Sequence, residues 1–180
     1  MKCYIRSSVM VSMLIMIIFG TGGCDVSDPS FIVDTDMTAV VEINEQSTSF
    51  DQSATADLSD LLGAVEGTIS DINVFNITLQ IDRLGNTPEN LIVSGAIAVD
   101  ENTLVSLVDV PISAFENERS IFDEDLADQY DFNVDNDGLQ YLLSLFDDLP
   151  TVTVGVSGEA SAQPVHMRVL TKLHAQVTTE

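Results

Sequence analysis

Residues 165–177 of the chain read VHMRVLTKLHAQV. Every second residue from Val165 to Val177 is apolar except Thr171, and the positions between them carry His, Arg, Lys and Gln with one leucine. Side chains alternate between the two faces of a β-strand, so this period predicts a strand with one buried face and one exposed face.

The same period recurs along the chain and indicates a fold made mainly of strands. The other segments that show it are 31–43, 72–82, 91–99, 103–112 and 151–157. Short helices are predicted at Leu61–Val65, at Asp123–Tyr130 and, most clearly, at Asp137–Phe146 with Asp137 as the N-cap. We therefore expect a single antiparallel β-sandwich, immunoglobulin-like, with one or two short helices; a small open barrel is the alternative.

The N-terminal residues predict export. Lys2 and Arg6 give a positive start without an acidic residue, and an apolar run follows at Val9–Phe19. A membrane-spanning helix needs about 20 apolar residues, whereas this run of 11 has the length of the apolar part of a signal peptide.

Small residues then lead to a cysteine, in the sequence Thr21-Gly22-Gly23-Cys24. This segment resembles the signal of bacterial lipoproteins, although that family usually has Leu where this chain has Thr21. The resemblance implies that the chain is cut before Cys24 and that Cys24 is acylated on its sulfur, for example with palmitate. It thus implies a signal peptide at 1–23, a lipidated tether at 24–30 and a folded domain at 31–180.

The cysteine count agrees with lipidation. The other cysteine, Cys3, lies inside the predicted signal, so Cys24 has no partner for an intramolecular disulfide in the mature chain. The alternative is an ordinary secretory signal cut near Gly23, which leaves Cys24 free. The expected location is the bacterial cell envelope, with the lipid in the outer or the inner membrane and the domain facing the periplasm or the cell surface.

The charge of the chain argues against nucleic acid as a partner. It holds 29 acidic residues and six Lys and Arg, a formal net charge of −23. Removal of Lys2 and Arg6 with the signal leaves four basic residues and a net charge of −25. Nucleic acid is not an expected partner, because phosphate binding requires clustered Lys and Arg. A surface this acidic stays soluble where salt screens its self-repulsion.

An acidic stretch at 116–137 is the first candidate site. Its last part, Asn133-Val134-Asp135-Asn136-Asp137 followed by Gly138, spaces oxygen ligands two residues apart and resembles the start of a calcium loop. The twelfth position of such a loop is normally Glu, and here it is Ser144. The alternative is a solvated acidic loop that ends in a helix cap. The candidate Ca²⁺ ligands are Asp131, Asn133, Asp135 and Asp137.

The polar face of the last strand is the second candidate site. It carries both histidines and half of the basic residues of the mature chain: His166, Arg168, Lys172 and His174. The two histidines are eight residues apart, about 26 Å along a strand, so they cannot share a metal. These residues are either a docking surface for an acidic partner, or a charged edge or outer strand that pairs with acids on its neighbour.

No pattern of the chain predicts catalysis. It has no GxSxG, GxGxxG, Walker or CxxC motif. We therefore expect a non-catalytic binding or structural module, held to the membrane by its lipid and facing an unknown envelope protein or component. A calcium-dependent binding or adhesion module is the first alternative, and a hydrolase that uses two carboxylates is a weaker one.

Overall fold

The computed structural model describes residues 31–63, 65, 68–148 and 150–179. The predicted signal peptide, Cys24 and the tether lie outside these residues. None of the helices in the described part of the chain is long and apolar enough to cross a membrane.

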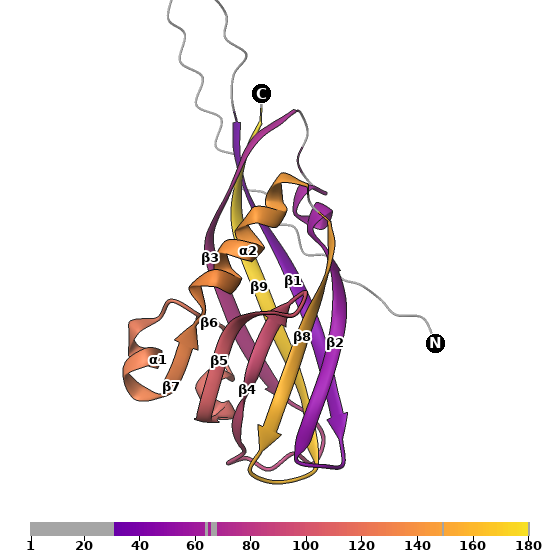
Figure 1. Ribbon diagram of the computed structural model, residues 1–180, viewed down its shortest axis with the longest axis vertical. Helices are drawn as coiled ribbons and strands as arrows, with labels where there is room; N and C mark the ends of the chain where they lie inside the picture. Colours follow the sequence, from indigo (N-terminus) through magenta and orange to yellow (C-terminus); the bar gives the residue numbers. More distant parts are fainter. Residues whose placement is uncertain (1–30, 64, 66–67, 149, 180) are drawn as a thin grey trace, which may run out of the picture.

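Two antiparallel sheets pack face to face as a sandwich (Figure 1). The first, named here the β1 sheet, has the order β1 (Phe31–Glu45), β9 (Val165–Thr179), β3 (Ile69–Arg83) and β6 (Arg119–Ser120). The second, the β2 sheet, has the order β2 (Ser49–Asp57), β8 (Thr151–Ala160), β4 (Ile92–Val99), β5 (Asn102–Pro111) and β7 (Asp131–Val134). The prediction of a mainly β sandwich is confirmed.

The order of the strands is that of a jelly roll. The first and last strands pair along their whole length, from Phe31 opposite Thr179 to Glu45 opposite Val165. The chain passes to the other sheet after most strands, and only β4–β5 and β7–β8 are consecutive strands that share a sheet. Jelly rolls are wound in this way, whereas an immunoglobulin-like sandwich places its first two strands in one sheet. The immunoglobulin-like prediction is therefore wrong, because alternation shows which face of a strand is buried and not which strand lies beside it.

The alternating positions of β9 form the centre of the core. Every second side chain from Val165 to Thr179 is buried. These side chains meet the inward faces of β1 and β3 on the same sheet and of β4, β5 and β8 across the sandwich. The predicted inward residues Met37, Ala39, Val41 and Ile43 of β1 are buried as well.

Helical segments close one end of the sandwich. The short 3₁₀ helix η1 (Leu58–Leu62) and the helix α2 (Asn136–Ser144) lie at the end where β1 begins and β9 ends, here called the N-terminal end (Figure 1). Their residues Leu58, Leu61 and Leu142 are buried in the core. The opposite end, here called the turn end, consists of the connections 46–48, 84–91 and 161–164.

The remaining short helices follow β5, β6 and helix α2, in that order. They are η2 (Ile112–Phe115), α1 (Glu124–Gln129) and η3 (Leu145–Asp147). The predicted helix at Asp123–Tyr130 is confirmed as α1, with Asp123 as its N-cap. Helix α2 is also confirmed, but it begins earlier than predicted, and Asp135 caps it instead of Asp137.

Two strand features differ from the sequence prediction. The alternation of segment 72–82 predicts that Phe75 shares the buried face of Ile77, yet the side chain of Phe75 is 54% exposed. A bulge between Val74 and Asn76 inserts Phe75 as an extra residue in β3 and so removes it from the alternation. Strand β2 was not predicted, because its sequence SFDQSATAD is mostly polar and buries only Phe50 and Ala56.

Candidate functional site

The exposed face of the β1 sheet gathers the basic side chains of β9. His166, Arg168, Lys172 and His174 lie on this face at alternate positions, as predicted. The strand is not at the edge of a sheet, however, because it pairs with β1 on one side and with β3 on the other. The edge-strand interpretation is therefore wrong, while the expected pairing with acids of neighbouring strands is present.

Five side chains converge near the middle of this face and are named here the Glu118 cluster: Asp36, Thr78, Glu118, Lys172 and His174. Nδ1 of His174 lies 2.8 Å from Oδ1 of Asp36, and its Nε2 lies 3.1 Å from Oε1 of Glu118. Nζ of Lys172 donates to Oε2 of Glu118 at 3.2 Å. The hydroxyl of Thr78 donates to Oε1 of Glu118 at 2.8 Å.

Strand register explains how these residues meet. His174 lies directly opposite Asp36 on β1 and opposite Asn76 on β3, while Lys172 lies opposite Thr78. Residues opposite each other on paired strands point to the same face, with Cβ atoms about 5 Å apart. Glu118 reaches the cluster because the next residues form β6, which pairs with β3 beside Thr78.

The surroundings of Glu118 favour its charged form. The hydrogen bond from Thr78 is the main reason that the pKa of this carboxyl lies below its usual range. Partial burial opposes that effect, and the hydrogen bond and positive charge of Lys172 and the contact with His174 reinforce it. Glu118 is therefore a carboxylate that accepts hydrogen bonds from Thr78 and Lys172 and that also contacts the ring of His174.

The other two basic residues of the face have partners of their own. Arg168 donates from Nε and Nη2 to Oε1 of Glu42 on β1, at 3.1 Å and 2.8 Å. Nε2 of His166 lies 3.2 Å from the side-chain amide of Gln46 at the turn end. The backbone of His166 also exchanges two hydrogen bonds with the hydroxyl of Thr87, at 2.6 Å and 2.8 Å.

The four predicted partner-binding residues thus form two separate groups. His174 and Lys172 belong to the Glu118 cluster, whereas His166 braces the turn end and Arg168 pairs with Glu42. The sequence did not single out Asp36 or Thr78, and it placed Glu118 in the acidic stretch 116–137 and not with the basic residues of β9. The polar faces of β1 and β3 were visible as alternation, but Glu118 comes from a segment with no strand pattern of its own, and only the folded chain places it on this face.

The candidate calcium residues lie on a strand and a helix start. Asp131 and Asn133 are exposed on β7, which pairs with β5. Oδ1 of Asp135 accepts the backbone N–H groups of Asp137 and Gly138, at 2.9 Å and 3.1 Å. The capping interpretation therefore describes the geometry of Asp135, and residues 131–138 do not form the predicted calcium-loop conformation. Within the part of the chain that the structure describes, no group of three His, Cys, Asp or Glu side chains is placed to hold a metal.

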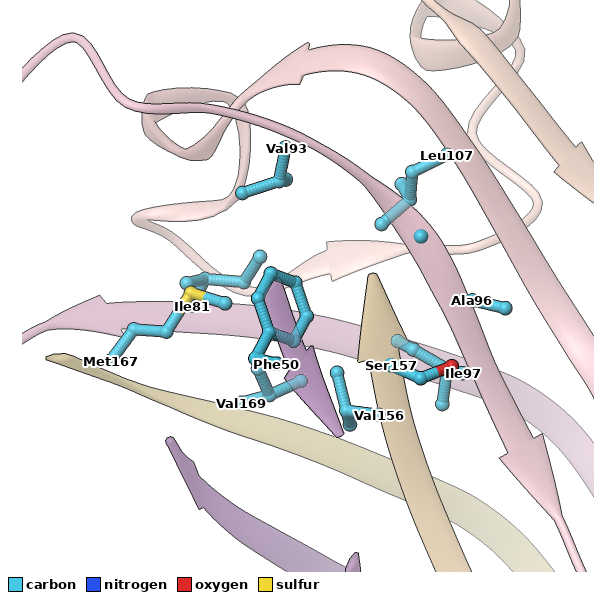
Figure 2. Close-up of a pocket in the computed structure, with 11 residues that line it drawn as sticks. Phe50, Ile81, Val93, Ala96, Ile97, Leu107, Val156, Ser157, Met167 and Val169 are labelled. Carbon is cyan, nitrogen blue, oxygen red and sulfur yellow. The ribbon is translucent and has the colours of Figure 1, made fainter. Parts of the chain in front are cut away.

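Two small apolar cavities lie inside the sandwich. One, drawn in Figure 2, has a volume of about 20 Å³ and lies between Phe50, Ile81, Val93 and Met167. The other, also about 20 Å³, lies nearer the N-terminal end beside Leu58 and Leu142. No acidic or histidine side chain lines either cavity. Each has room for about one water molecule, so we interpret both as packing gaps in the core.

Comparison with known proteins adds little. No protein-family model matches the chain, and no curated protein matches it. A solved structure described as the decameric BFDV capsid protein matches with 14% sequence identity and a TM-score of 0.37, over 83% of this chain and 99% of that one. A likeness this distant carries no argument about function.

Proposed function

We propose that this chain is a bacterial envelope lipoprotein whose β-sandwich is a non-catalytic binding or structural module. The observation that carries the proposal is the order of features at the N-terminus: two basic residues, the apolar run Val9–Phe19, small residues and Cys24. In this proposal a lipid on Cys24 holds the domain at a membrane, and the domain holds a partner protein or another component of the envelope.

The arrangement of the strands suggests how such a domain is presented. Only residues 25–30 separate Cys24 from the start of β1, a distance of at most about 25 Å when extended. A lipid on Cys24 would therefore keep the N-terminal end near the membrane. Strand β1 has 15 residues, so the turn end would lie about 50 Å further out. We propose that the turn end, 46–48, 84–91 and 161–164, faces the partner.

The roles of the histidines support a binding or structural module over an enzyme. His166 links the turn at Gln46 to the connection that contains Thr87, so it braces two of the three segments of the turn end. His174 lies between Asp36 and Glu118 on the β1 sheet. The His174 side chain thus links strands to the segment before β6, and the His166 side chain contacts the connection at Gln46. Preorganised loops bind with less loss of conformational entropy, which suits a docking surface.

Lipidation is tested on the full chain in a bacterial host fed an alkyne analogue of palmitate. We expect the wild type to incorporate the label and to enter the detergent phase on phase separation. Cys24→Ser should do neither. Cys3→Ser is the matched control, since the proposal removes Cys3 with the signal, and it should behave as the wild type. Equal labelling of the Cys24→Ser variant would refute the lipoprotein assignment.

The proposed orientation is tested with two matched cysteine variants of the lipidated protein. Ser47 lies exposed in a connection of the turn end, and Ser70 lies exposed near the start of β3, at the N-terminal end. A fluorescent donor on each, in vesicles that carry a headgroup acceptor, should transfer energy more efficiently from Ser70→Cys than from Ser47→Cys. Equal transfer would mean that the domain lies flat on the membrane and that the turn end is not presented outward.

A further inference from the structure

The ring of His174 is placed between two carboxylates from different parts of the chain. Asp36, on β1, lies 2.8 Å from Nδ1, and Glu118, from the segment before β6, lies 3.1 Å from Nε2. The side chain of His174 is only 17% exposed, and the ring of Phe75 lies beside it with 6.1 Å between centroids. The imidazole therefore connects strand β1 to the acidic segment through strand β9.

The hydrogen-bond chemistry of imidazole makes this connection dependent on pH. A protonated imidazole has two N–H groups and can donate to both carboxylates, whereas a neutral imidazole has one N–H and one lone pair. In the neutral form one carboxylate faces a lone pair and is repelled. We propose that His174 is a pH-dependent clasp that holds the segment 116–123 against the β1 sheet when it is protonated and loosens that segment when it is neutral.

The partners of the two carboxylates indicate which contact is lost first. Glu118 also receives hydrogen bonds from Lys172 and Thr78, whereas His174 is the only hydrogen-bond partner of the Asp36 carboxylate among the described residues. The single remaining proton therefore stays on Nδ1, toward Asp36. The contact between Nε2 and Glu118 is then lost. The Thr78 hydroxyl, 3.3 Å from Nε2, can turn to donate to the ring, which removes a second donor from Glu118.

The charged groups around the ring do not provide another link of this kind. Strand β1 contributes one acid to the ring, Asp36. The neighbouring acid of that strand, Asp34, accepts a hydrogen bond from Gln176 instead. Strand β3 contributes the uncharged Asn76 and Thr78 at this level. Lys172, on β9 itself, keeps its contact with Glu118 in either state, so the segment is loosened and not released.

Segment 116–123 also makes a backbone hydrogen bond to β3, and the amide of that bond can be used to measure local opening. The backbone N–H of Ile121 donates to the carbonyl of Ile77 at 2.9 Å, and the side chain of Ile121 is buried. This amide is exposed to exchange only when the segment opens away from β3. Its hydrogen-exchange protection therefore measures how often the clasp allows opening.

We would measure the protection factor of the Ile121 amide between pH 5 and pH 8.5, the range in which histidines change charge. Division by the intrinsic exchange rate at each pH removes the ordinary effect of hydroxide. We expect protection in the wild type to fall about two- to fivefold as the pH rises, as for the loss of one partly exposed ion pair. Protection of a core amide of β9, such as that of Val169, should stay constant.

Matched variants identify the group that titrates. His174→Gln should abolish the pH dependence of Ile121 protection, and His166→Gln, which replaces the other histidine of the chain, should retain it. A wild type with constant protection, or a pH dependence lost in His166→Gln and kept in His174→Gln, overturns the proposal. If His174→Gln does not fold, ¹⁵N chemical shifts of the wild-type ring decide: we expect the neutral form to carry its proton on Nδ1, and a proton on Nε2 overturns the assignment. None of these results depends on lipidation, so the clasp stands or fails separately from the proposed function.

Discussion

At the scale of the residue, Gly138 matches a calcium-loop motif in the sequence but has a different role in the structure. In the sequence it matched the glycine that permits a sharp turn in a calcium loop. In the structure it lies in helix α2, pressed against the first residues of β5. A Cβ atom at this position would lie 1.8 Å from the carbonyl oxygen of Thr103. The glycine is required because a helix approaches a strand backbone closely.

Replacement of Gly138 by alanine should therefore be costly. Because the obstacle is backbone on both sides, we expect Gly138→Ala to lower the free energy of unfolding by at least about 2 kcal/mol, measured by urea denaturation. Gly155→Ala is the matched control, since nothing lies within 4 Å of the added Cβ there, and it should stay within about 0.5 kcal/mol of the wild type. Similar losses in both variants would contradict this interpretation.

Glu118 should contribute to the acid sensitivity of the fold. Its pKa lies below the usual value of 4.5, mainly because of the hydrogen bond from Thr78. A carboxyl with a lowered folded-state pKa adds stability above its unfolded pKa and loses it as the pH falls through the folded value. The Tm difference between the wild type and Glu118→Gln should thus shrink as the pH drops below about 4.5.

The control for this experiment is Glu116→Gln. Glu116 is exposed on the same segment, and no side-chain hydrogen bond or salt bridge within the described residues involves it. The Tm of Glu116→Gln should equal that of the wild type at every pH. A Tm difference for Glu118→Gln that persists at pH 3 would mean that the side chain acts through packing and not through its charge.

At the scale of the element, the β4–β5 hairpin combines strain with specific bonding. Its two turn residues, Asp100 and Glu101, have φ of 47° and 71°, in the left-handed region. Gly, Asn and Asp tolerate this conformation, whereas it strains a residue such as Glu101. Asp100 accepts a hydrogen bond from the backbone N–H of Thr153 at 2.7 Å and one from the hydroxyl of Tyr141 at 3.2 Å. No side-chain hydrogen bond of Glu101 compensates its strain within the described part of the chain.

The two turn residues should consequently respond in opposite directions to the same substitution. Glu101→Gly relieves the strain and should raise the free energy of unfolding by about 0.5–1 kcal/mol. Asp100→Gly relieves less strain, because Asp tolerates positive φ, and it removes two hydrogen bonds, one to β8 and one to α2. It should therefore lower stability by about 1 kcal/mol. Chemical denaturation of both variants checks the signs, and a destabilised Glu101→Gly would show that the strain is compensated elsewhere.

Helix α2 gives a test of the calcium hypothesis. Asp135 accepts two backbone N–H groups at the start of the helix, so Asp135→Ala should cost about 1 kcal/mol, and Asp137→Ala, which leaves the cap in place, should cost less. Because the capping role needs no metal, we expect Tm to be the same in millimolar calcium and in chelator at fixed ionic strength. A rise in Tm with calcium that Asp135→Ala abolishes would restore the calcium-dependent module.

At the scale of the whole molecule, the main feature is the large negative net charge and its effect on thermal stability. The formal net charge is −23, and Arg168 and Lys172 of the exposed β1 face are already paired with carboxylates. The remaining acids repel one another, and the Debye length falls from about 30 Å at 0.01 M salt to about 3 Å at 1 M. We expect Tm to rise between these conditions in NaCl and equally in KCl, because screening does not depend on the cation. A Tm that stays constant or falls would show that the ion pairs outweigh the repulsion.

The sequence by itself determined the class of the fold and its buried faces. Alternation in β1, β4, β8 and β9 predicts which side chains enter the core, because burial of one face of a strand depends on local order along the chain. The N-terminal segment likewise carries its own prediction of export, through the apolar run and Cys24. Helix α2 was visible from its leucine spacing, although its cap was placed two residues too late.

Only the tertiary structure decided how these pieces are joined. Alternation is the same whether a strand lies beside its sequence neighbour or beside the other end of the chain. The jelly-roll order and the central place of β9 therefore could not be predicted from the sequence. The bulge that exposes Phe75 depends on the register with β9. The Glu118 cluster depends on three strands and on a segment without a strand pattern of its own, which meet because backbone pairing brings together residues that are 40 to 138 positions apart. Local sequence determines which face of an element is buried, and long-range pairing determines which residues share a site.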